Sequence, residues 1–180
     1  SEKVVVVTGA ASGIGRALAQ QLSMQGANLA LSDVNMEALE ETASILRGTG
    51  KVTLQKLDVA DRGAWEAYAE QVKADHGQVD MIINNAGVAL SETVERMSYE
   101  DMEWIVNINF WGVVYGTKSF LPLLKERPES AIVNVSSIFG IIALPTQAAY
   151  NATKFAVRGF TESLRQELKG TNVFVTTVHP

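Results

Sequence analysis

The chain has 180 residues, of which 47% are hydrophobic and 19% are charged, a composition typical of one globular domain. A formal net charge of −5 with no run of lysine or arginine argues against a nucleic-acid surface and favours a small-molecule partner. The absence of cysteine excludes disulfides, thiolate metal sites and cysteine nucleophiles. Two histidines are too few for an all-histidine cluster, so we expect no metal site.

The most hydrophobic stretches do not indicate insertion into a membrane. Residues 4–7 form a short apolar run that passes directly into a glycine-rich turn, unlike a signal peptide. Residues 105–124 contain two asparagines, a lysine and a proline, which would be costly across a bilayer. We therefore expect a cytoplasmic protein without a membrane partner.

Short runs rich in β-branched residues predict six strands, at residues 3–8, 28–32, 52–57, 79–84, 131–135 and 173–178. Five helices are expected between them, at residues 15–25, 36–46, 62–75, 99–124 and 149–168, with Asp61 and Ser98 as N-caps. The strands are almost continuously apolar, as expected of parallel strands covered on both faces. The alternation predicts an α/β fold: a doubly wound, Rossmann-like parallel sheet with strand order 3-2-1-4-5-6. We expect residues 1–180 to form a single dinucleotide-binding and catalytic domain.

The first predicted strand runs directly into a glycine-rich turn at residues 9–15, with the spacing Gly-x-x-x-Gly-x-Gly. Glycines at a strand-to-helix junction allow a tight turn and close approach of a ligand. A pyrophosphate would then meet free N–H groups at the helix N-terminus. We assign five residues of this turn to cofactor binding: Gly9, Ser12, Gly13, Ile14 and Gly15.

Carboxylates end the next two predicted strands. Asp33 could accept hydrogen bonds from both hydroxyls of an adenosine ribose and would repel a 2′-phosphate, which favours NAD over NADP. The alternative is that Asp33 caps the helix beginning near Met36. Asp58 and Val59 end the third strand, where they could contact the adenine, although Asp58 could also serve as a helix cap.

Tyr150 and Lys154 stand four residues apart in a predicted helix, so their side chains lie about 40° apart on one face. A nearby ammonium favours the charged form of a phenol, which makes a tyrosine usable for proton transfer at neutral pH. The same spacing also arises by chance on many helices. The pair gains meaning from the glycine-rich turn and from the motifs that lie between the two.

Three further motifs stand at predicted strand ends or in a helix: Asn84-Asn85-Ala86-Gly87, Asn107-Ile108-Asn109 and Ser137. With the glycine-rich turn and the Tyr150/Lys154 pair, they make the whole chain resemble the short-chain dehydrogenase/reductase family. The family pattern usually continues through a Pro-Gly turn, a substrate loop and a seventh strand. Because the sequence ends at His179-Pro180, we expect it to be truncated at its C-terminus, without the last family strand and the substrate loop.

The resemblance implies four catalytic residues. By it, Tyr150 is the acid/base, and Lys154 promotes ionisation of Tyr150 and binds the nicotinamide ribose. Ser137 orients the substrate oxygen, and Asn109 holds a water in a proton relay through Lys154. Ser136 is the alternative to Ser137, but neighbours on a strand face opposite sides and the family's interval to the tyrosine selects Ser137. Asn109 could also be an ordinary polar residue inside a helix.

The remaining predictions concern the cofactor, the substrate and the oligomer. Asn85, Ala86 and Gly87 would let the backbone pass close to ribose and nicotinamide, whereas Asn84 could instead pin its strand. A moderately hydrophobic alcohol or ketone could contact nearby apolar residues, which could equally be core: Val88, Leu90, Ile138, Phe139, Ile141, Ile142 and Leu144. The long apolar helices around residues 104–121 and 152–168 predict a homodimer or homotetramer.

The leading hypothesis is an NAD(H)-dependent oxidoreductase that interconverts a secondary alcohol and a ketone by hydride transfer. The alternatives are an NADP-dependent carbonyl reductase and a non-catalytic dinucleotide-binding sensor. An epimerase or dehydratase built on the same nucleotide site also stays open, because a fold does not determine a function.

Overall fold

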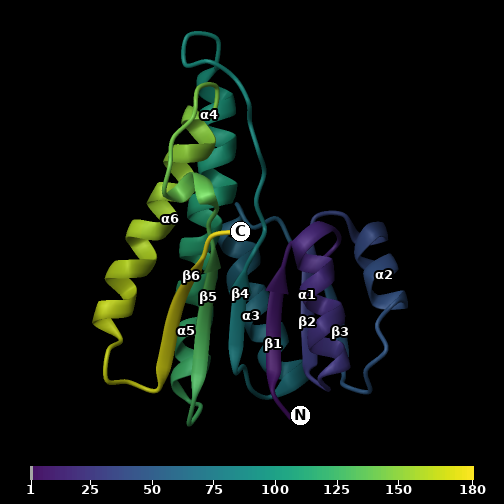
Figure 1. Cartoon of the computed structure of the whole chain (residues 1–180). Helices are drawn as coiled ribbons and strands as arrows, with labels where there is room; N and C mark the ends of the chain where they lie inside the picture. The colour runs from purple at the N-terminus through teal and green to yellow at the C-terminus, as the bar shows by residue number, and fades with distance from the viewer. Residues whose placement is uncertain (1) are drawn as a thin grey trace.

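Six parallel strands form one sheet in the order β3-β2-β1-β4-β5-β6 in the computed structural model, which describes residues 2–180 (Figure 1). Their bounds are β1 (Val4–Thr8), β2 (Asn28–Asp33), β3 (Val52–Lys56), β4 (Met81–Asn84), β5 (Ser130–Val135) and β6 (Val173–Val178). The predicted doubly wound sheet and its strand order are confirmed. The predicted bounds of β6 are confirmed, and each of the other five strands differs from its prediction at one end by one or two residues, as is usual at element ends.

Helices connect the strands and cover the sheet. They are α1 (Gly13–Met24), α2 (Met36–Ser44), α3 (Arg62–His76), α4 (Tyr99–Val106), η1 (Asn107–Trp111), α5 (Gly112–Lys125), η2 (Ile138–Gly140) and α6 (Ala148–Glu167). Asp61 and Ser98 cap α3 and α4 as predicted, each accepting a hydrogen bond from the backbone three residues later.

Two hydrophobic clusters lie on opposite faces of the sheet because successive side chains of each strand point in opposite directions. Val5 and Val7 of β1 belong to the cluster that includes Ala19 of α1 and Leu39 of α2. Val6 belongs to the other cluster, beneath α3, α5 and α6. Three aromatic rings pack together there with centroids 5.9–6.2 Å apart, those of Trp65, Tyr68 and Phe120. This double covering gives the site at the strand ends a rigid support.

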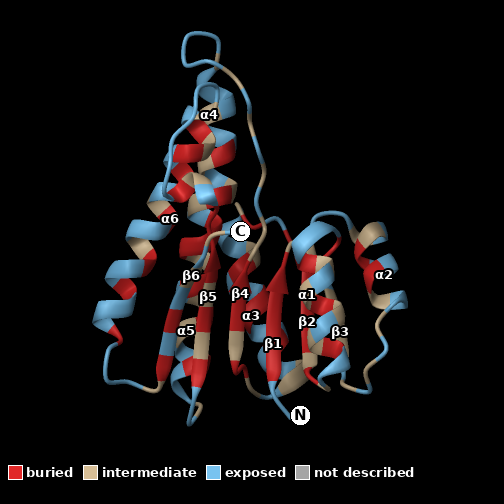
Figure 2. Ribbon diagram, viewed as in Figure 1, coloured by how far each residue is buried: buried red, intermediate tan, exposed pale blue. Residues whose placement is uncertain are grey.

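The expectation that every strand is covered on both faces is wrong for the edge strand β6. Val173 and Val175 are buried, whereas Phe174 is 62% exposed and Val178 is 41% exposed. Within residues 2–180, α1 and α2 pack against β1, β2 and β3 on the face that Phe174 shares, and the burial colours of Figure 2 show β6 partly exposed. The apolar sequence of a strand therefore does not show whether one or both of its faces are covered by helices.

The predicted single helix at residues 99–124 is interrupted by the π-helical turn η1 between α4 and α5. A π-helical turn inserts a residue into the helix and is frequent at functional sites. Here it carries Asn109, whose side chain is fully buried. The predicted start of the first helix was also wrong: α1 begins at Gly13 rather than Gly15, so the last two loop glycines lie in its first turn.

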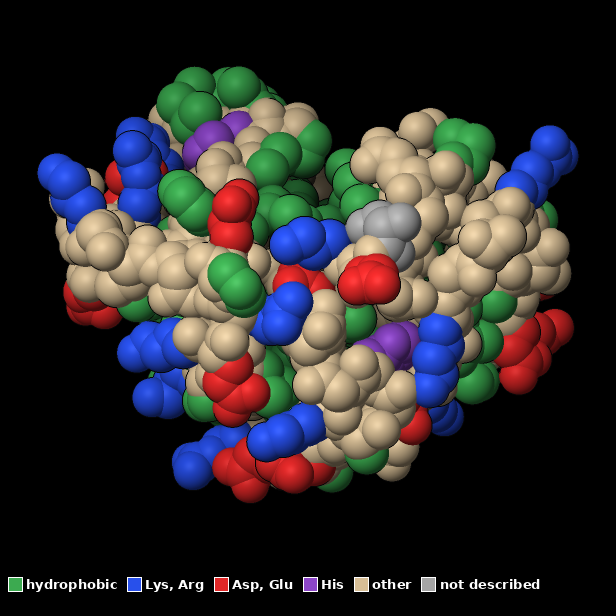
Figure 3. Space-filling view, turned by 90° about the horizontal axis from the view of Figure 1, so that it is seen from below, with side chains coloured by type: hydrophobic (Ala, Val, Ile, Leu, Met, Phe, Trp, Pro, Cys, Tyr) green, Lys and Arg blue, Asp and Glu red, His purple; other side chains and the backbone are tan. Residues whose placement is uncertain are grey.

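The surface seen from the amino ends of the strands carries acidic and basic side chains interspersed (Figure 3). Among residues 2–180, no helix combines the length and the apolar character needed to cross a bilayer.

Candidate active site

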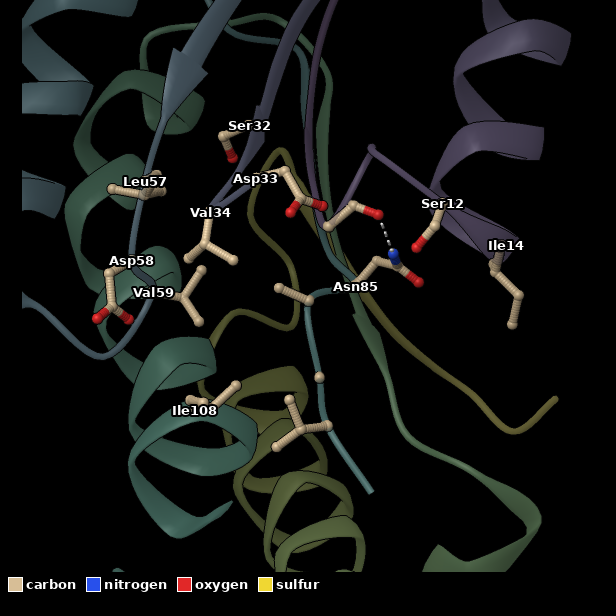
Figure 4. Close-up of a pocket in the computed structure, with 15 residues that line it drawn as sticks. Ser12, Ile14, Ser32, Asp33, Val34, Leu57, Asp58, Val59, Asn85 and Ile108 are labelled. Atoms are coloured by element: carbon tan, nitrogen blue, oxygen red, sulfur yellow. Dashed lines mark hydrogen bonds between the residues drawn. The ribbon is translucent and has the colours of Figure 1, made fainter. Parts of the chain in front are cut away.

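The carboxyl ends of β1, β2, β3 and β4 border a cavity of about 370 Å³ (Figure 4). The strand order reverses between β1 and β4, which is where ligands bind in open α/β sheets. Ten of the predicted cofactor residues line it: Gly9, Ser12, Gly13, Ile14, Asp33, Asp58, Val59, Asn85, Ala86 and Gly87. The structure adds Ser32, Val34, Leu57, Val88 and Ile108. Gly15 is not part of the lining, and Tyr150 and Lys154 line the adjoining hollow.

The three glycines of the turn are needed for different reasons. Gly9 and Gly13 have φ of 64° and 53°, in the left-handed region that residues with a Cβ rarely adopt. Gly15 has no such φ, but a Cβ on it would lie 2.0 Å from the carbonyl oxygen of Gly9. Gly15 thus lets α1 start directly against the loop, and its contribution to ligand binding is indirect.

Helix α1 differs from its neighbours at its N-terminus. Ser12 is the N-cap residue but its side chain makes no capping hydrogen bond. In contrast, Asn35, Asp61 and Ser98 each cap their own helix with a side-chain oxygen. The first N–H groups of a helix lack partners within it, and here no cap covers them on the side of the cavity. This terminus fits the pyrophosphate of a dinucleotide.

Thr8, which sequence reasoning missed, ties β1 to the segment after β4. Its Oγ1 accepts hydrogen bonds from the N–H groups of Asn85 and Ala86, both at 3.0 Å. The Asn85 amide donates in return to the carbonyls of Thr8, at 3.1 Å, and Gly9, at 3.3 Å. Asn85 therefore fixes the start of the glycine-rich turn by direct contact, as the dashed line in Figure 4 shows.

Arg16 and Thr42 hold the middle of the turn, and neither was predicted. The Arg16 guanidinium donates to the carbonyl of Ala11 at 2.7 Å and to Thr42 Oγ1 at 2.9 Å. Thr42 donates to the carbonyl of Ala10 at 2.8 Å. A cation in the first turn of a helix opposes the helix dipole, and this mismatch is the sequence signal that could have revealed Arg16.

Asp33 lies at the far wall of the cavity and does not cap α2. Its Oδ2 accepts from the N–H of Ala11 at 3.0 Å and its Oδ1 from the N–H of Asn35 at 3.1 Å. Asn35 is the N-cap, since its Oδ1 accepts from Ala38. The capping alternative for Asp33 is therefore wrong. Each carboxylate oxygen has a second lone pair available for a ribose hydroxyl.

Asp58 also does not cap a helix. Its Oδ1 accepts from the N–H of Ala60 at 2.9 Å, which closes a local turn after β3, and Asp61 takes the capping position of α3. The carboxylate of Asp58 lies at the edge of the cavity (Figure 4).

Ser137, Tyr150 and Lys154 line a second hollow of about 320 Å³ that shares Ile14, Asn85, Gly87 and Val88 with the first. The ammonium of Lys154 lies 5.6 Å from the centroid of the Tyr150 ring, within the range of a cation–π contact. The ring of Phe139 meets that of Tyr150 edge-on, with centroids 5.9 Å apart. The predicted common face of Tyr150 and Lys154 is confirmed.

Lys154 is an almost fully buried cation, with 5% of its surface exposed. Its Nζ donates to the carbonyl of Val135 at 3.2 Å. Burial lowers the pKa of Lys154 to about 8, because removal of water disfavours the charged form. The folded protein thus holds beside Tyr150 an ammonium that is costly in the absence of a ligand.

The two neighbouring serines have different partners. Ser136 Oγ donates to the carbonyl of Lys154 at 2.9 Å and is thereby committed to α6. Ser137 Oγ accepts from the N–H of Phe139 at 3.2 Å, which leaves its hydroxyl proton available to a substrate. Both serines follow the end of β5 and line the hollow, so the expected alternation does not separate them, and it is the available hydroxyl proton that favours Ser137. His179, missed by sequence reasoning, places its Nδ1 2.9 Å from the carbonyl oxygen of Ser137.

The side-chain amide of Asn109 makes hydrogen bonds with other groups of the protein. Its Oδ1 accepts from the N–H of Val88 and its Nδ2 donates to the carbonyl of Val88, both at 2.8 Å. Nδ2 also donates to Thr153 Oγ1 at 3.2 Å. Asn109 therefore positions the segment after β4, and its role in a proton relay stays a prediction. A Cβ on Gly87 would lie 3.3 Å from Asn109 Oδ1 and 3.4 Å from Lys154 Nζ, which explains the small residue there.

Asn84 pins its strand, the alternative considered for it. The side chain is buried and donates to Asn134 Oδ1 of β5 at 2.9 Å.

The apolar residues between Ser137 and α6 are not core: Ile138, Ile141, Ile142 and Leu144 are each 45–48% exposed.

Within residues 2–180, no group of three or more histidine, aspartate or glutamate side chains could hold a metal ion.

A family model described as "short chain dehydrogenase" matches residues 3–180. Among curated relatives, an oxidoreductase of Mycobacterium tuberculosis named SadH is 51% identical over 99% of this chain and 66% of its own length. A cyclopentanol dehydrogenase of Comamonas testosteroni is 36% identical over 100% of the chain and 72% of its own.

Solved structures give the same relationship. A short-chain dehydrogenase/reductase from Burkholderia phymatum in complex with NAD superimposes with a TM-score of 0.94 at 34% identity, over 97% of this chain and 64% of that one. An alcohol dehydrogenase from Thermococcus sibiricus complexed with 5-hydroxy-NADP gives 0.92 at 29% identity, over 99% and 75%. The chain thus spans just under two thirds of the length of the M. tuberculosis relative and of the B. phymatum structure.

Proposed function

The chain belongs to the short-chain dehydrogenase/reductase family, and from this premise we propose that the protein interconverts a secondary alcohol and a ketone with NAD(H). The main observation in support of the proposal is that the cavity at the ends of β1 to β4 adjoins the second hollow. The hollow with Ser137, Tyr150 and Lys154 shares four residues with the cavity beneath the uncapped N-terminus of α1. A dinucleotide bound in the cavity would supply hydride acceptance or donation at the substrate carbon.

The side chains of the second hollow manage the substrate oxygen and its proton. Alcohol oxidation releases a proton from the hydroxyl, and ketone reduction requires one. Tyr150 takes this proton as a phenolate during oxidation and gives it as a phenol during reduction, while the Ser137 hydroxyl donates a hydrogen bond to the same oxygen. The ammonium of Lys154, over the ring of Tyr150, stabilises negative charge on the phenol oxygen.

We assign NAD rather than NADP to the cavity because of Asp33. The family includes both a structure with NAD and one with an NADP derivative, so family membership leaves the choice open. Asp33 lines the adenosine end with a carboxylate whose two oxygens already accept backbone hydrogen bonds and are fixed in place. A 2′-phosphate would meet this negative charge, whereas ribose hydroxyls would find acceptors.

The proposed substrate is moderately hydrophobic. Exposed isoleucine and leucine side chains follow Ser137 directly and lie on the chain between it and Tyr150. Half-exposed apolar side chains on the segment that joins two site residues favour a ligand with an apolar body. One relative is named for cyclopentanol, an apolar secondary alcohol, which supports this substrate class.

A panel of secondary alcohols and ketones with the full-length protein tests the proposal, with NADH absorbance as the readout. We expect turnover with NAD, loss of turnover in Ser137→Ala, and full activity in Ser44→Ala, a change at an exposed serine of α2 outside both hollows. No redox turnover with any member, together with measurable NAD binding, would favour a non-catalytic dinucleotide sensor.

We also propose that the protein self-associates through the outer faces of α4, η1 and α6. Trp104, Trp111 and Phe155 are 45%, 43% and 40% exposed, a concentration of large apolar side chains that favours a protein interface. Phe155→Glu should lower the mass measured by light scattering, whereas Met24→Glu, at a 60% exposed methionine of α1, should not. An unchanged mass for Phe155→Glu would place the interface elsewhere.

The cytoplasmic location stays a prediction.

A further inference from the structure

The segment of residues 138–147, here named the apolar segment, joins Ser137 to α6 and is mostly without regular structure beyond the short turn η2. Four of its large apolar side chains are close to half exposed. A segment of this kind would normally move relative to the helix that follows it. Its position relative to Tyr150 therefore needs a specific cause.

Asn151 provides that cause from the residue directly after Tyr150. Its Nδ2 donates to the carbonyls of Phe139 and Ile142, both at 2.7 Å. Its Oδ1 accepts from the N–H of Leu144 at 3.2 Å. The side chain is 5% exposed, and one amide group satisfies three backbone groups that together span the apolar segment. The segment is thus registered to the first turn of α6.

The far end of the apolar segment is anchored as well. Thr146 has a φ of 67°, in the left-handed region, which is unfavourable for a β-branched residue. Its carbonyl accepts from the N–H of Glu92 at 2.8 Å, and its hydroxyl accepts from Ser91 at 3.3 Å. Such a conformation persists only when the surroundings determine it, and it is enriched where strain serves a function. The segment is therefore held between α6 and the loop after β4.

We propose that Asn151 is a positioning residue that sets the distance between the apolar segment and Tyr150 and thereby determines which hydrophobic substrates the site accepts. This inference rests on the proposed function, because it assigns the segment to the apolar body of the alcohol or ketone. Asn151 itself touches backbone groups and acts through the side chains of Ile141, Ile142 and Leu144.

Two variants and a matched control test the proposal in the full-length protein. Asn151→Ala removes all three hydrogen bonds, and Asn151→Asp keeps the size and the acceptor for Leu144 but removes both donations. Asn172→Ala is the control, because Asn172 Nδ2 also donates to two backbone carbonyls, those of Lys125 and Arg127, at the opposite end of the sheet. The substrates are isopropanol, which has no apolar body beyond its two methyl groups, and a secondary octanol.

We expect both Asn151 variants to lose about tenfold or more in kcat/KM for the octanol, mainly through KM, with little change for isopropanol. NAD affinity and the Asn172→Ala values should stay at the wild-type level. Equal losses for both alcohols, or the same pattern in Asn172→Ala, would show a purely structural role and overturn the proposal.

Hydrogen exchange separates this inference from the proposed function. Backbone amides of the apolar segment should exchange faster in Asn151→Ala than in wild type or Asn172→Ala, whether or not any alcohol turns over. If the wild-type protein oxidises no alcohol yet exchange accelerates, the proposed function fails and the positioning role stands. Unchanged exchange overturns the positioning role itself.

Discussion

The glycine-rich turn before α1 and the apolar segment before α6 both join a strand to a helix at the same edge of the sheet, but they present different polar groups. The turn offers backbone N–H groups, held by the φ angles of Gly9 and Gly13 and by contacts from Arg16. The α6 side offers the side chains of Tyr150 and Lys154. A substitution can remove backbone N–H donors from the site only by displacing the chain, whereas it can remove a single side-chain group and leave the chain in place.

The largest expected effect is on the side-chain region. Tyr150→Phe removes the phenol oxygen and keeps the ring, so we expect turnover to fall by about two to four orders of magnitude. NAD affinity measured by calorimetry should change little, because the turn and Asp33 are untouched. Tyr99→Phe, at an 87% exposed tyrosine, is the control. A Tyr150→Phe variant with more than half of wild-type turnover would refute the acid/base assignment.

The backbone region should respond to an added methyl group. A Cβ at residue 15 would lie 2.0 Å from the Gly9 carbonyl oxygen, so Gly15→Ala must displace the turn. Overpacking costs about 1–3 kcal/mol, and with a rigid backbone as the obstacle we expect NAD affinity to fall about a hundredfold. Gly63→Ala, where the nearest atom is 3.5 Å away, should bind NAD normally. Equal affinities of the two variants in calorimetry would mean that the turn does not hold the cofactor.

Asp33 contributes a charged side chain to the region in which the glycine-rich turn offers backbone N–H groups. Asp33→Ala should shift preference from NADH toward NADPH by about tenfold to a hundredfold, about 1.4–3 kcal/mol. Asp33→Asn keeps an acceptor but removes the charge, so it should show the gain for NADPH with a smaller loss for NADH. Fluorescence titration of both cofactors measures the ratio. Tighter binding of NADPH than NADH by the wild type would contradict this role of Asp33.

The smallest expected effect concerns stability. Burial lowers the pKa of Lys154 from its usual value of 10.5 to about 8, so below pH 8 the buried charge costs its full amount. Between pH 8 and 10.5 the unfolded chain binds the proton more tightly, and this group's contribution to the unfolding free energy therefore rises with pH. A pKa difference of about 2.5 corresponds to a destabilisation of about 3 kcal/mol by the buried charge. A substitution that removes this charge also removes the hydrogen bond to Val135, which offsets about 1 kcal/mol of the gain.

Lys154→Met should therefore raise the unfolding free energy of the cofactor-free protein by about 2 kcal/mol at pH 7. The gain should shrink as the pH rises from 8 to 10.5. Urea unfolding at pH 7 and above pH 10 measures the gain in unfolding free energy. Lys118→Met, a change at an exposed lysine, is the control. A gain that is the same at pH 7 and above pH 10 would show that buried charge is not its source.

Features that depend on local spacing could be predicted from the amino-acid sequence alone. Runs of β-branched residues between helical stretches led to the six parallel strands and their order, because right-handed crossovers leave few topologies. Four-residue spacing placed Tyr150 and Lys154 on one helix face, and the glycines marked the turn after β1. Each of these inferences uses residues that are close in the chain, where backbone geometry alone relates one side chain to the next.

Pairing between groups that are distant in the chain could not be predicted in this way, because it depends on the packing of the folded protein. Thr8 binds backbone groups 77 and 78 residues away, and Asn109 clamps Val88 across 21 residues. The one-sided burial of β6 and the burial of Lys154 likewise depend on what packs against them rather than on their own sequence. Nothing in the local sequence of Asn151 distinguishes it from an exposed helical asparagine. Its role follows from the three backbone groups that folding brings within reach, because a hydrogen bond needs its partner in place.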